Sequence, residues 1–220
     1  MEPVVLGKAI SSISICMLFT AFLIVEARSL RNSAYAYIAQ ASLLVLVFLS
    51  IAVFGHEKHF YIWATTASIT KVFIVPYLVL WTISKVGSEY EEPPLLPRGV
   101  SAIIDAVLVI IGFATAYYIP LKLPLYSLRA CLGVSFSLML MGMWGMVGRR
   151  CALKQTICLC HMENGVHLLL ATLAYKSPVT VEIGILTDAV LAIAIMLYLS
   201  IMIKRVTGSL DTYRMRSLRW

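Results

Sequence analysis

Charged residues are scarce in this sequence. They make up 13% of the 220 residues, while 60% are hydrophobic and the mean hydropathy is +0.89. A soluble globular chain carries about 25% charged residues, so this chain lacks the charge that a water-facing surface needs. The composition therefore excludes an ordinary soluble protein and predicts an all-α, polytopic integral membrane protein.

The sequence also lacks the patterns of a catalytic or cofactor site. It contains no phosphate-binding glycine loop, no nucleophile elbow and no second cysteine pair that could complete a zinc tetrahedron. Its five cysteines lie in or beside apolar runs, where cysteine behaves as a small hydrophobe. Cys158 and Cys160 are two residues apart, so on a helix they point about 200° away from each other. We therefore expect no metal and no cofactor in this chain.

Seven apolar segments have the roughly 20 residues that a bilayer span needs. They are Val4–Val25, Ala34–Phe54, Phe60–Ser84, Gly99–Tyr118, Tyr126–Val147, Ala152–Tyr175 and Val179–Ile203. The first is too long for the apolar core of a signal peptide, so we expect it to remain as a span. The breaks carry charged residues, Pro or Gly, and none is long enough for a globular domain. Seven transmembrane helices are therefore predicted.

Basic residues are divided unequally between the two sides of these spans. Twelve lie on the side of the C-terminus and five on the other, namely Lys8, Lys58, Lys122, Arg129 and Lys176. Because cytoplasmic loops carry the excess of Lys and Arg, we predict an outside N-terminus and a cytoplasmic C-terminus. The basic residues do not interleave with exposed aromatics, so the net charge of +7 indicates topology and not nucleic-acid binding.

Several ionisable residues lie inside the predicted spans. They are Lys71, Asp105, Glu163, Glu182 and Asp188, joined by His161 and His167. A charge near the bilayer centre costs about 2.5–3.5 kcal/mol, so each needs a partner, a wet cavity or a function. Positively and negatively charged side chains are both present, and the sequence has no nucleophile motif. This combination indicates a pathway for protons or ions rather than covalent catalysis.

Depth separates these candidates. Glu163 and Lys71 each lie eleven residues into their spans, about 16 Å deep. Asp188 lies nine residues into the last span, about 14 Å deep. Asp105 and Glu182 are shallower and could face an interface, or Asp105 could pair with a nearby Ser or Thr. The three central residues are therefore the strongest candidates.

The neighbours of Glu163 favour a polar site. His167 lies four residues on and shares its helix face, so a hydrogen bond between the two is geometrically easy. Asn164 adds a neutral donor and acceptor in the same turn. Gly165 points away and lets another backbone come close behind the helix. His161 is expected on a different face.

Lys71 is followed by Pro76, which frees a backbone carbonyl and bends the helix beside the charge. An unpaired ammonium at this depth is costly. We therefore expect Lys71 to pair with a carboxylate from Asp105, from the last two helices or from a neighbouring subunit.

The stretch GMWGMVGRRCALKQTICLCHMENGVHLLLATLAY resembles the first loop and second helix of subunit K (chain 4L) of respiratory complex I. The last helix, VEIGILTDAVLAIAIMLYLSIMI, resembles that subunit's third helix. The phrases ENG, VEIGI and GSLDTYRMRSL are more similar still to the hydrogenase-4 component E family, in which extra N-terminal helices precede such a module. The resemblance implies a four-helix region over residues 1–125 and a subunit K-like three-helix module with a basic tail over 126–220.

The resemblance further implies a subunit of a complex I-like group 4 [NiFe]-hydrogenase or formate hydrogenlyase in the cell membrane. Antiporter-like membrane subunits and soluble hydrogenase-like subunits would be its partners, and those subunits would hold the NiFe centre and iron–sulfur clusters. Glu163 would be the glutamate of the second subunit K helix, and Lys71 has no counterpart. The second acid is Asp188 or Glu182, because Asp188 is an aspartate and only 25 residues from Glu163.

A stand-alone secondary transporter of a cation or small solute is the alternative. Inverted repeats would support it, and the two halves show no convincing internal symmetry. A retinal protein would need its lysine in the last span, whereas Lys71 lies in the third.

Overall fold

A computed structural model describes residues 3–54, 58–119, 129–173 and 179–218. Helices make up nearly all of this part of the chain, and the only β-pairs in it are two isolated bridges. The helices are α1 (Pro3–Glu26), α2 (Leu30–Phe54), α3 (His59–Ala67), the π-helix η1 (Ser68–Ile74), α4 (Val75–Val86), α5 (Arg98–Tyr118), α6 (Arg129–Gly148), α7 (Ala152–Leu173), α8 (Val179–Thr207) and the 3₁₀-helix η3 (Thr212–Leu218). The all-α prediction is confirmed.

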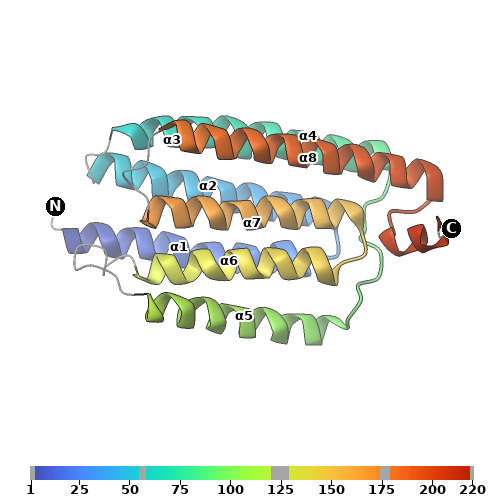
Figure 1. Ribbon diagram of the computed structural model, residues 1–220, viewed down its shortest axis with the longest axis horizontal. Coiled ribbons are helices and arrows are strands. Elements are labelled where there is room, and N and C mark those ends of the chain that lie inside the picture. Colours follow the sequence, from blue (N-terminus) through green and yellow to red (C-terminus); the bar gives the residue numbers. More distant parts are fainter. Residues whose placement is uncertain (1–2, 55–57, 120–128, 174–178, 219–220) are drawn as a thin grey trace.

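The long helices run side by side along one axis (Figure 1). The segments α3, η1 and α4 follow one another without a break and form a single rod beside α8. On the opposite side of the bundle α5 packs on α6, and α7 lies in the middle, in contact with α6, α2 and α8. The two chain termini lie at opposite ends of the bundle (Figure 1).

Glycine and proline set the helix ends near one end of the bundle. The helix α4 ends at Gly87, which has a φ of 70°, in the left-handed region that glycine adopts without a Cβ penalty. Pro93, Pro94 and Pro97 follow in the connection, where proline cannot continue a helix. The helix α5 then starts directly after Pro97.

Within the described part of the chain, five helices are long and apolar enough to cross a membrane. They are Leu30–Phe54, His59–Val86, Arg98–Tyr118, Arg129–Gly148 and Leu186–Thr207, and Ile10–Glu26 forms a shorter apolar helix. The helix α7 is not among them, because charged and polar side chains interrupt its apolar sequence. Most of its side chains are buried within the bundle. The chain is therefore a membrane protein, and the count of seven spans and the orientation stay predictions.

Glycines bring α6 and α7 into close contact. A Cβ added at Gly142 would lie 2.6 Å from Met162 Cβ and 2.8 Å from its backbone nitrogen. A Cβ added at Gly165 would lie 2.9 Å from the backbone nitrogen of Met139. The close approach of a backbone behind the Glu163 helix is thus confirmed.

Gly142→Ala is expected to lower the midpoint of thermal unfolding of the detergent-solubilised chain. The new methyl group meets backbone atoms that cannot rotate away, and overpacking of this kind destabilises by about 1–3 kcal/mol. Gly184→Ala in α8 is the matched control, because a Cβ there meets nothing within 4 Å. Equal melting temperatures for both variants would show that α6 and α7 do not pack this closely.

Candidate functional site

A polar layer crosses the middle of the bundle between two apolar cores. In α7, buried apolar residues up to Cys160 belong to one core and those from Leu168 onward belong to the other. The rod α3–η1–α4 is divided in the same way, since Phe60 to Ala67 and Val75 to Ile83 join different cores. Glu163 and Lys71 fall in the gaps between. The two central charges therefore occupy one layer with apolar packing on either side.

Lys71 is carried by the π-helical turn η1. The backbone N–H of Val75 donates to the carbonyl of Thr70, a π-type i to i−5 bond, just before Pro76, which has no N–H to offer. The proline predicted to disturb the helix beside Lys71 thus directly follows a π-helical segment, and the bend itself stays a prediction. Such turns are rare and often mark functional positions in helices.

Lys71 forms a buried ion pair with Glu163. Its Nζ donates to Glu163 Oε1 at 2.8 Å and to Asn164 Oδ1 at 3.1 Å. The Lys71 side chain is 2% exposed and that of Glu163 is 12% exposed. The predicted pairing of Lys71 with a carboxylate is confirmed, and the partner comes from the helix before the last.

Gln40 of α2 connects two further residues of α7 to this pair. Its Oε1 accepts a hydrogen bond from Asn164 Nδ2 at 3.2 Å and lies 2.9 Å from His161 Nδ1. Its Nε2 donates to the carbonyl of Met17 at 3.3 Å, which fixes the orientation of the amide. His161 Nδ1 must therefore carry the proton, and its Nε2 has no hydrogen-bond partner in the described part of the chain. His161 thus joins the same layer, although a different face was expected.

His167 does not make the hydrogen bond expected with the Glu163 carboxylate. Its Nδ1 lies 3.0 Å from the backbone carbonyl oxygen of Glu163 and 3.7 Å from Oε1. The carbonyl one turn back is the better placed acceptor, and the carboxylate is already engaged by Lys71. His167 Nε2 finds no partner among the described residues. Two histidines thus bring unpaired ring nitrogens into the layer.

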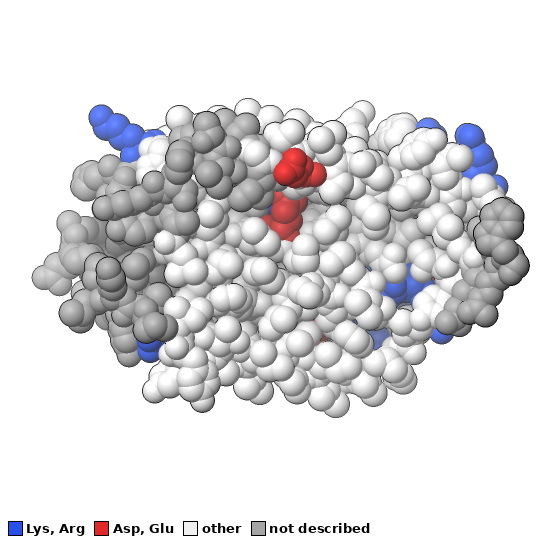
Figure 2. All heavy atoms as spheres, in the orientation of Figure 1, with Lys and Arg blue, Asp and Glu red and all other residues white. Residues whose placement is uncertain are grey.

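Among the described residues, Asp188 is not joined to the ion pair. Asp188 is exposed on α8, and within the described residues no hydrogen bond or ion pair links it to the layer. The Glu182 side chain lies outside what the structure describes. Acidic atoms interrupt the otherwise uncharged middle of the face formed by α7 and α8 (Figure 2). The structure pairs Lys71 with Glu163, whereas Asp188 makes no hydrogen bond or ion pair with either residue in the described part of the chain.

Asp105 lies in a second polar cluster, near the N-terminal end of α7. It is 1% exposed, and its carboxyl group lies close to the side chains of Glu26 and Arg149. Ser101, one turn before it, donates instead to Glu26 Oε1 at 2.5 Å, and Arg149 Nη2 lies 2.6 Å from the same oxygen. The serine partner considered for Asp105 is not found, because Glu26 takes the Ser101 hydroxyl, and the shallow depth of Asp105 stays a prediction.

Arg149 in the turn between α6 and α7 and Lys154 in the first turn of α7 are buried, although both were counted as loop charges. Arg149 is 2% exposed, and its Nη1 lies 3.0 Å from Glu91 Oε1. Lys154 is fully buried and donates to Ala27 O at 2.7 Å and Ser33 Oγ at 2.6 Å. Burial raises the pKa of the Glu91 carboxyl, and the positive charges of Lys154 and Arg149 act against that rise. These contacts tie the connection before α5 to the bundle.

The described residues contain no group of three or more His, Cys, Asp or Glu side chains that could hold a metal ion. All five cysteines are free thiols, four of them buried and Cys16 exposed. The layer therefore offers proton-binding and hydrogen-bonding groups as its chemistry.

Comparisons with known proteins cover the part of the chain that forms α6, α7 and α8 and most of the rest. The family model of NADH-ubiquinone/plastoquinone oxidoreductase chain 4L matches residues 130–220. Hydrogenase-4 component E of Escherichia coli is 33% identical over 205 residues, which cover 92% of this chain and 94% of the relative. The Shigella flexneri protein of the same name gives the same values.

A more distant relative is an uncharacterized protein of Mycobacterium tuberculosis, 23% identical over 68% of each chain. No solved structure matches the chain at a significant level. The similarity to hydrogenase-4 component E thus covers most of the chain and is not confined to its C-terminal part. The chain therefore belongs to the hydrogenase-4 component E family.

Proposed function

We propose that this chain is a membrane-arm subunit of a complex I-like group 4 [NiFe]-hydrogenase or related redox complex in the cell membrane. Family membership supports the assignment. Its partners are antiporter-like membrane subunits and soluble hydrogenase-like subunits, which hold the NiFe centre and iron–sulfur clusters. The chain crosses the membrane seven times, with its N-terminus outside and its C-terminus in the cytoplasm.

We further propose that the chain takes part in proton or sodium translocation coupled to electron transfer. The observation that carries this proposal is the ion pair of Lys71 and Glu163, 2.8 Å long, in a polar layer between two apolar cores. A buried pair of opposite charges is a poor source of stability, because desolvation offsets its Coulomb attraction. It is well suited to a switch, because a charge arriving nearby changes which partner each group prefers.

The proposed step is a proton transfer at Glu163. A negative charge that approaches from a neighbouring subunit draws the Lys71 ammonium away from Glu163 Oε1. The carboxylate, left without a cation, then takes a proton from the neighbouring subunit, and it releases that proton to an acceptor in the layer when Lys71 returns. The unpaired Nε2 atoms of His161 and His167 are acceptors in the same layer. Charge movement in the neighbour is thereby converted into protonation of this subunit.

A second acid passes the signal onward in this scheme. Asp188 is exposed on α8, where a neighbouring subunit can reach it. Glu182 lies on the same helix and is the alternative. Asp105 is buried beside the Glu26–Arg149 pair. In this scheme it exchanges protons at the end of the bundle where Arg149 also pairs with Glu91.

Purification in mild detergent tests the assignment to a complex. An affinity tag on this chain is expected to recover antiporter-like membrane subunits and hydrogenase-like soluble subunits together, because the chain belongs to the hydrogenase-4 component E family. A tag on an unrelated multi-pass protein of the same membrane is the control. Recovery of the chain alone, together with solute transport after reconstitution into liposomes, would contradict the proposal and favour a stand-alone transporter.

A further inference from the structure

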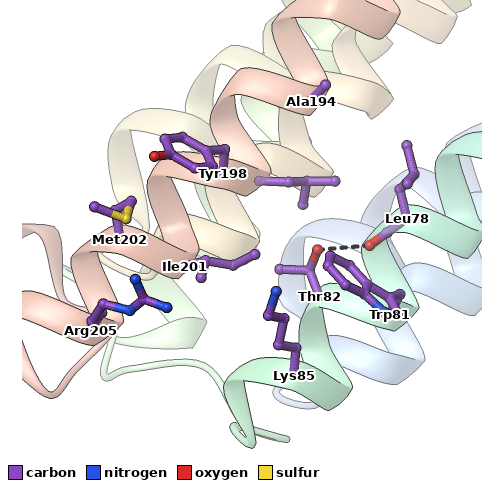
Figure 3. Close-up of a pocket in the computed structure, with 10 residues that line it drawn as sticks. Leu78, Trp81, Thr82, Lys85, Ala194, Tyr198, Ile201, Met202 and Arg205 are labelled. Atoms are coloured by element: carbon purple, nitrogen blue, oxygen red, sulfur yellow. Dashed lines mark hydrogen bonds between the residues drawn. The ribbon is translucent and has the colours of Figure 1, made fainter.

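An apolar groove with a basic end lies between α4 and α8. It has a volume of about 290 Å³ and is lined by ten residues: Leu78, Trp81, Thr82, Lys85, Ala194, Leu197, Tyr198, Ile201, Met202 and Arg205. Figure 3 shows Lys85 and Arg205 together at one end, and Ala194 and Leu78 at the other. The groove thus changes from basic to apolar along the helix axes.

The walls of the groove offer little to a polar ligand. Thr82 is the only lining hydroxyl besides Tyr198, and its Oγ1 donates to the carbonyl of Leu78 at 2.8 Å within its own helix. Trp81 is 48% exposed and Tyr198 61% exposed. Apolar rings left open in this way are typical of a surface that faces lipid tails near the headgroup region.

The basic end has positive charge without a matching acid. Lys85 and Arg205 are exposed, none of the lining residues is acidic, and neither cation forms an ion pair in the described part of the chain. Lys85 Nζ lies 4.5 Å from the centre of the Trp81 ring, which holds the ammonium over the mouth of the groove. Both cations lie near the ends of α4 and α8 that the charge distribution places at the cytoplasmic interface.

We propose that this groove is a binding site for an anionic glycerophospholipid. The phosphate of the headgroup sits between Lys85 and Arg205, and one acyl chain lies along Leu197, Ile201 and the Trp81 ring. Charge complementarity favours this occupant, because the cations stand at headgroup depth and the apolar wall continues toward the bilayer centre. A neighbouring protein helix would have to supply two acids at the same depth.

Fluorescence quenching by brominated lipids tests the site directly. The full chain is reconstituted into phosphatidylcholine vesicles that contain a minor fraction of brominated phosphatidylglycerol or brominated phosphatidylcholine. The fluorescence of Trp81 is obtained by subtracting the tryptophan emission of the Trp81→Phe variant from that of the chain that keeps Trp81. We expect the brominated phosphatidylglycerol to quench Trp81 in preference to the brominated phosphatidylcholine.

Charge variants separate the site from general attraction to the membrane. Each interfacial cation is worth about a fivefold preference, so Lys85→Gln lowers the preference about fivefold and Lys85→Gln with Arg205→Gln about thirtyfold. Lys58→Gln removes an exposed lysine at the opposite end of the bundle and leaves the preference unchanged. Ala194→Phe fills the apolar end while keeping both cations, and we expect it to abolish quenching from the groove.

Three results would overturn the proposal. Equal quenching by the two brominated lipids would mean that the groove does not select an anionic headgroup. A preference that survives the double glutamine variant would place the selectivity elsewhere. Quenching that occurs in the isolated chain and is absent in the intact complex would assign the groove to a neighbouring subunit.

Discussion

Glu163→Gln is expected to leave the complex assembled and to lower turnover-driven ion uptake on the order of tenfold or more. Glutamine keeps the shape and a carbonyl oxygen for Lys71 Nζ, which Asn164 Oδ1 also contacts at 3.1 Å. It cannot ionise, so the proton transfer at this position is lost. General acid–base groups contribute about 10²–10⁴-fold to the steps they serve, which supports an effect of this size.

Glu163→Asp is the matched variant. It keeps an ionisable carboxyl on a shorter arm, so part of the uptake should remain. Proton or sodium uptake is measured in vesicles while the complex turns over, alongside the rate of electron transfer. Lys58→Gln is the control, because Lys58 lies outside the polar layer. Asn164→Asp and Gln40→Glu are unsuitable as controls, because both would change the charge of the layer. Full uptake in the glutamine variant would reduce Glu163 to a structural hydrogen-bonding residue.

A double-mutant cycle on Lys71 and Glu163 is expected to separate stability from coupling. Removing one member of a buried ion pair costs about 3–5 kcal/mol, because the other charge is left buried without its partner. Replacing both members with neutral groups is often close to neutral. Lys71→Met combined with Glu163→Gln should therefore unfold at nearly the wild-type temperature, while each single variant unfolds earlier.

Ion uptake should not follow the same cycle. If the pair acts as a switch, the double variant regains stability and still fails to couple ion uptake to turnover. Thermal unfolding of the purified complex and uptake in vesicles are measured on the same preparations. Recovery of uptake in the double variant would show that the pair only holds the helices together. Additive losses of stability would show that the two residues do not interact.

The helices themselves followed from the apolar runs. The first predicted span, Val4–Val25, matches α1 (Pro3–Glu26) to within one residue at each end. The charged residues that follow the apolar run marked its end in the sequence. The third, Phe60–Ser84, becomes the continuous rod α3–η1–α4. Its proline indicated a bend near Lys71, but whether a bend becomes a kink or a π-helix depends on packing against α2 and α8, which local sequence does not encode.

The central charges were recognisable because a lone Lys71 or Glu163 in an apolar run has no ordinary explanation. Their pairing was not, since Asp105, α7, α8 and a neighbouring subunit all offered a carboxylate and only the tertiary arrangement selects one. Gln40 was overlooked because a neutral amide in an apolar span stands out less than a charge. Its position inside the span Ala34–Phe54 was the signal that could have identified it.

Arg149 and Lys154 show a different limit of sequence reasoning. They flank a short turn between two spans, where charged side chains normally face water. The count of basic residues on each side of the membrane therefore treated both as water-facing. In the structure the turn is covered by the segment that carries Glu91, so both side chains are buried. A contact between residues so far apart along the chain leaves no local pattern in the sequence.

Difference infrared spectroscopy of the complex during turnover tests most directly whether Glu163 changes protonation. We expect turnover to produce a band in the carbonyl-stretch region of protonated carboxylic acids that shifts in heavy water. In Glu163→Gln that band should be absent, and in Glu163→Asp it should appear at a shifted position. The same band with unchanged intensity in the Glu163→Gln variant would contradict a proton transfer at Glu163.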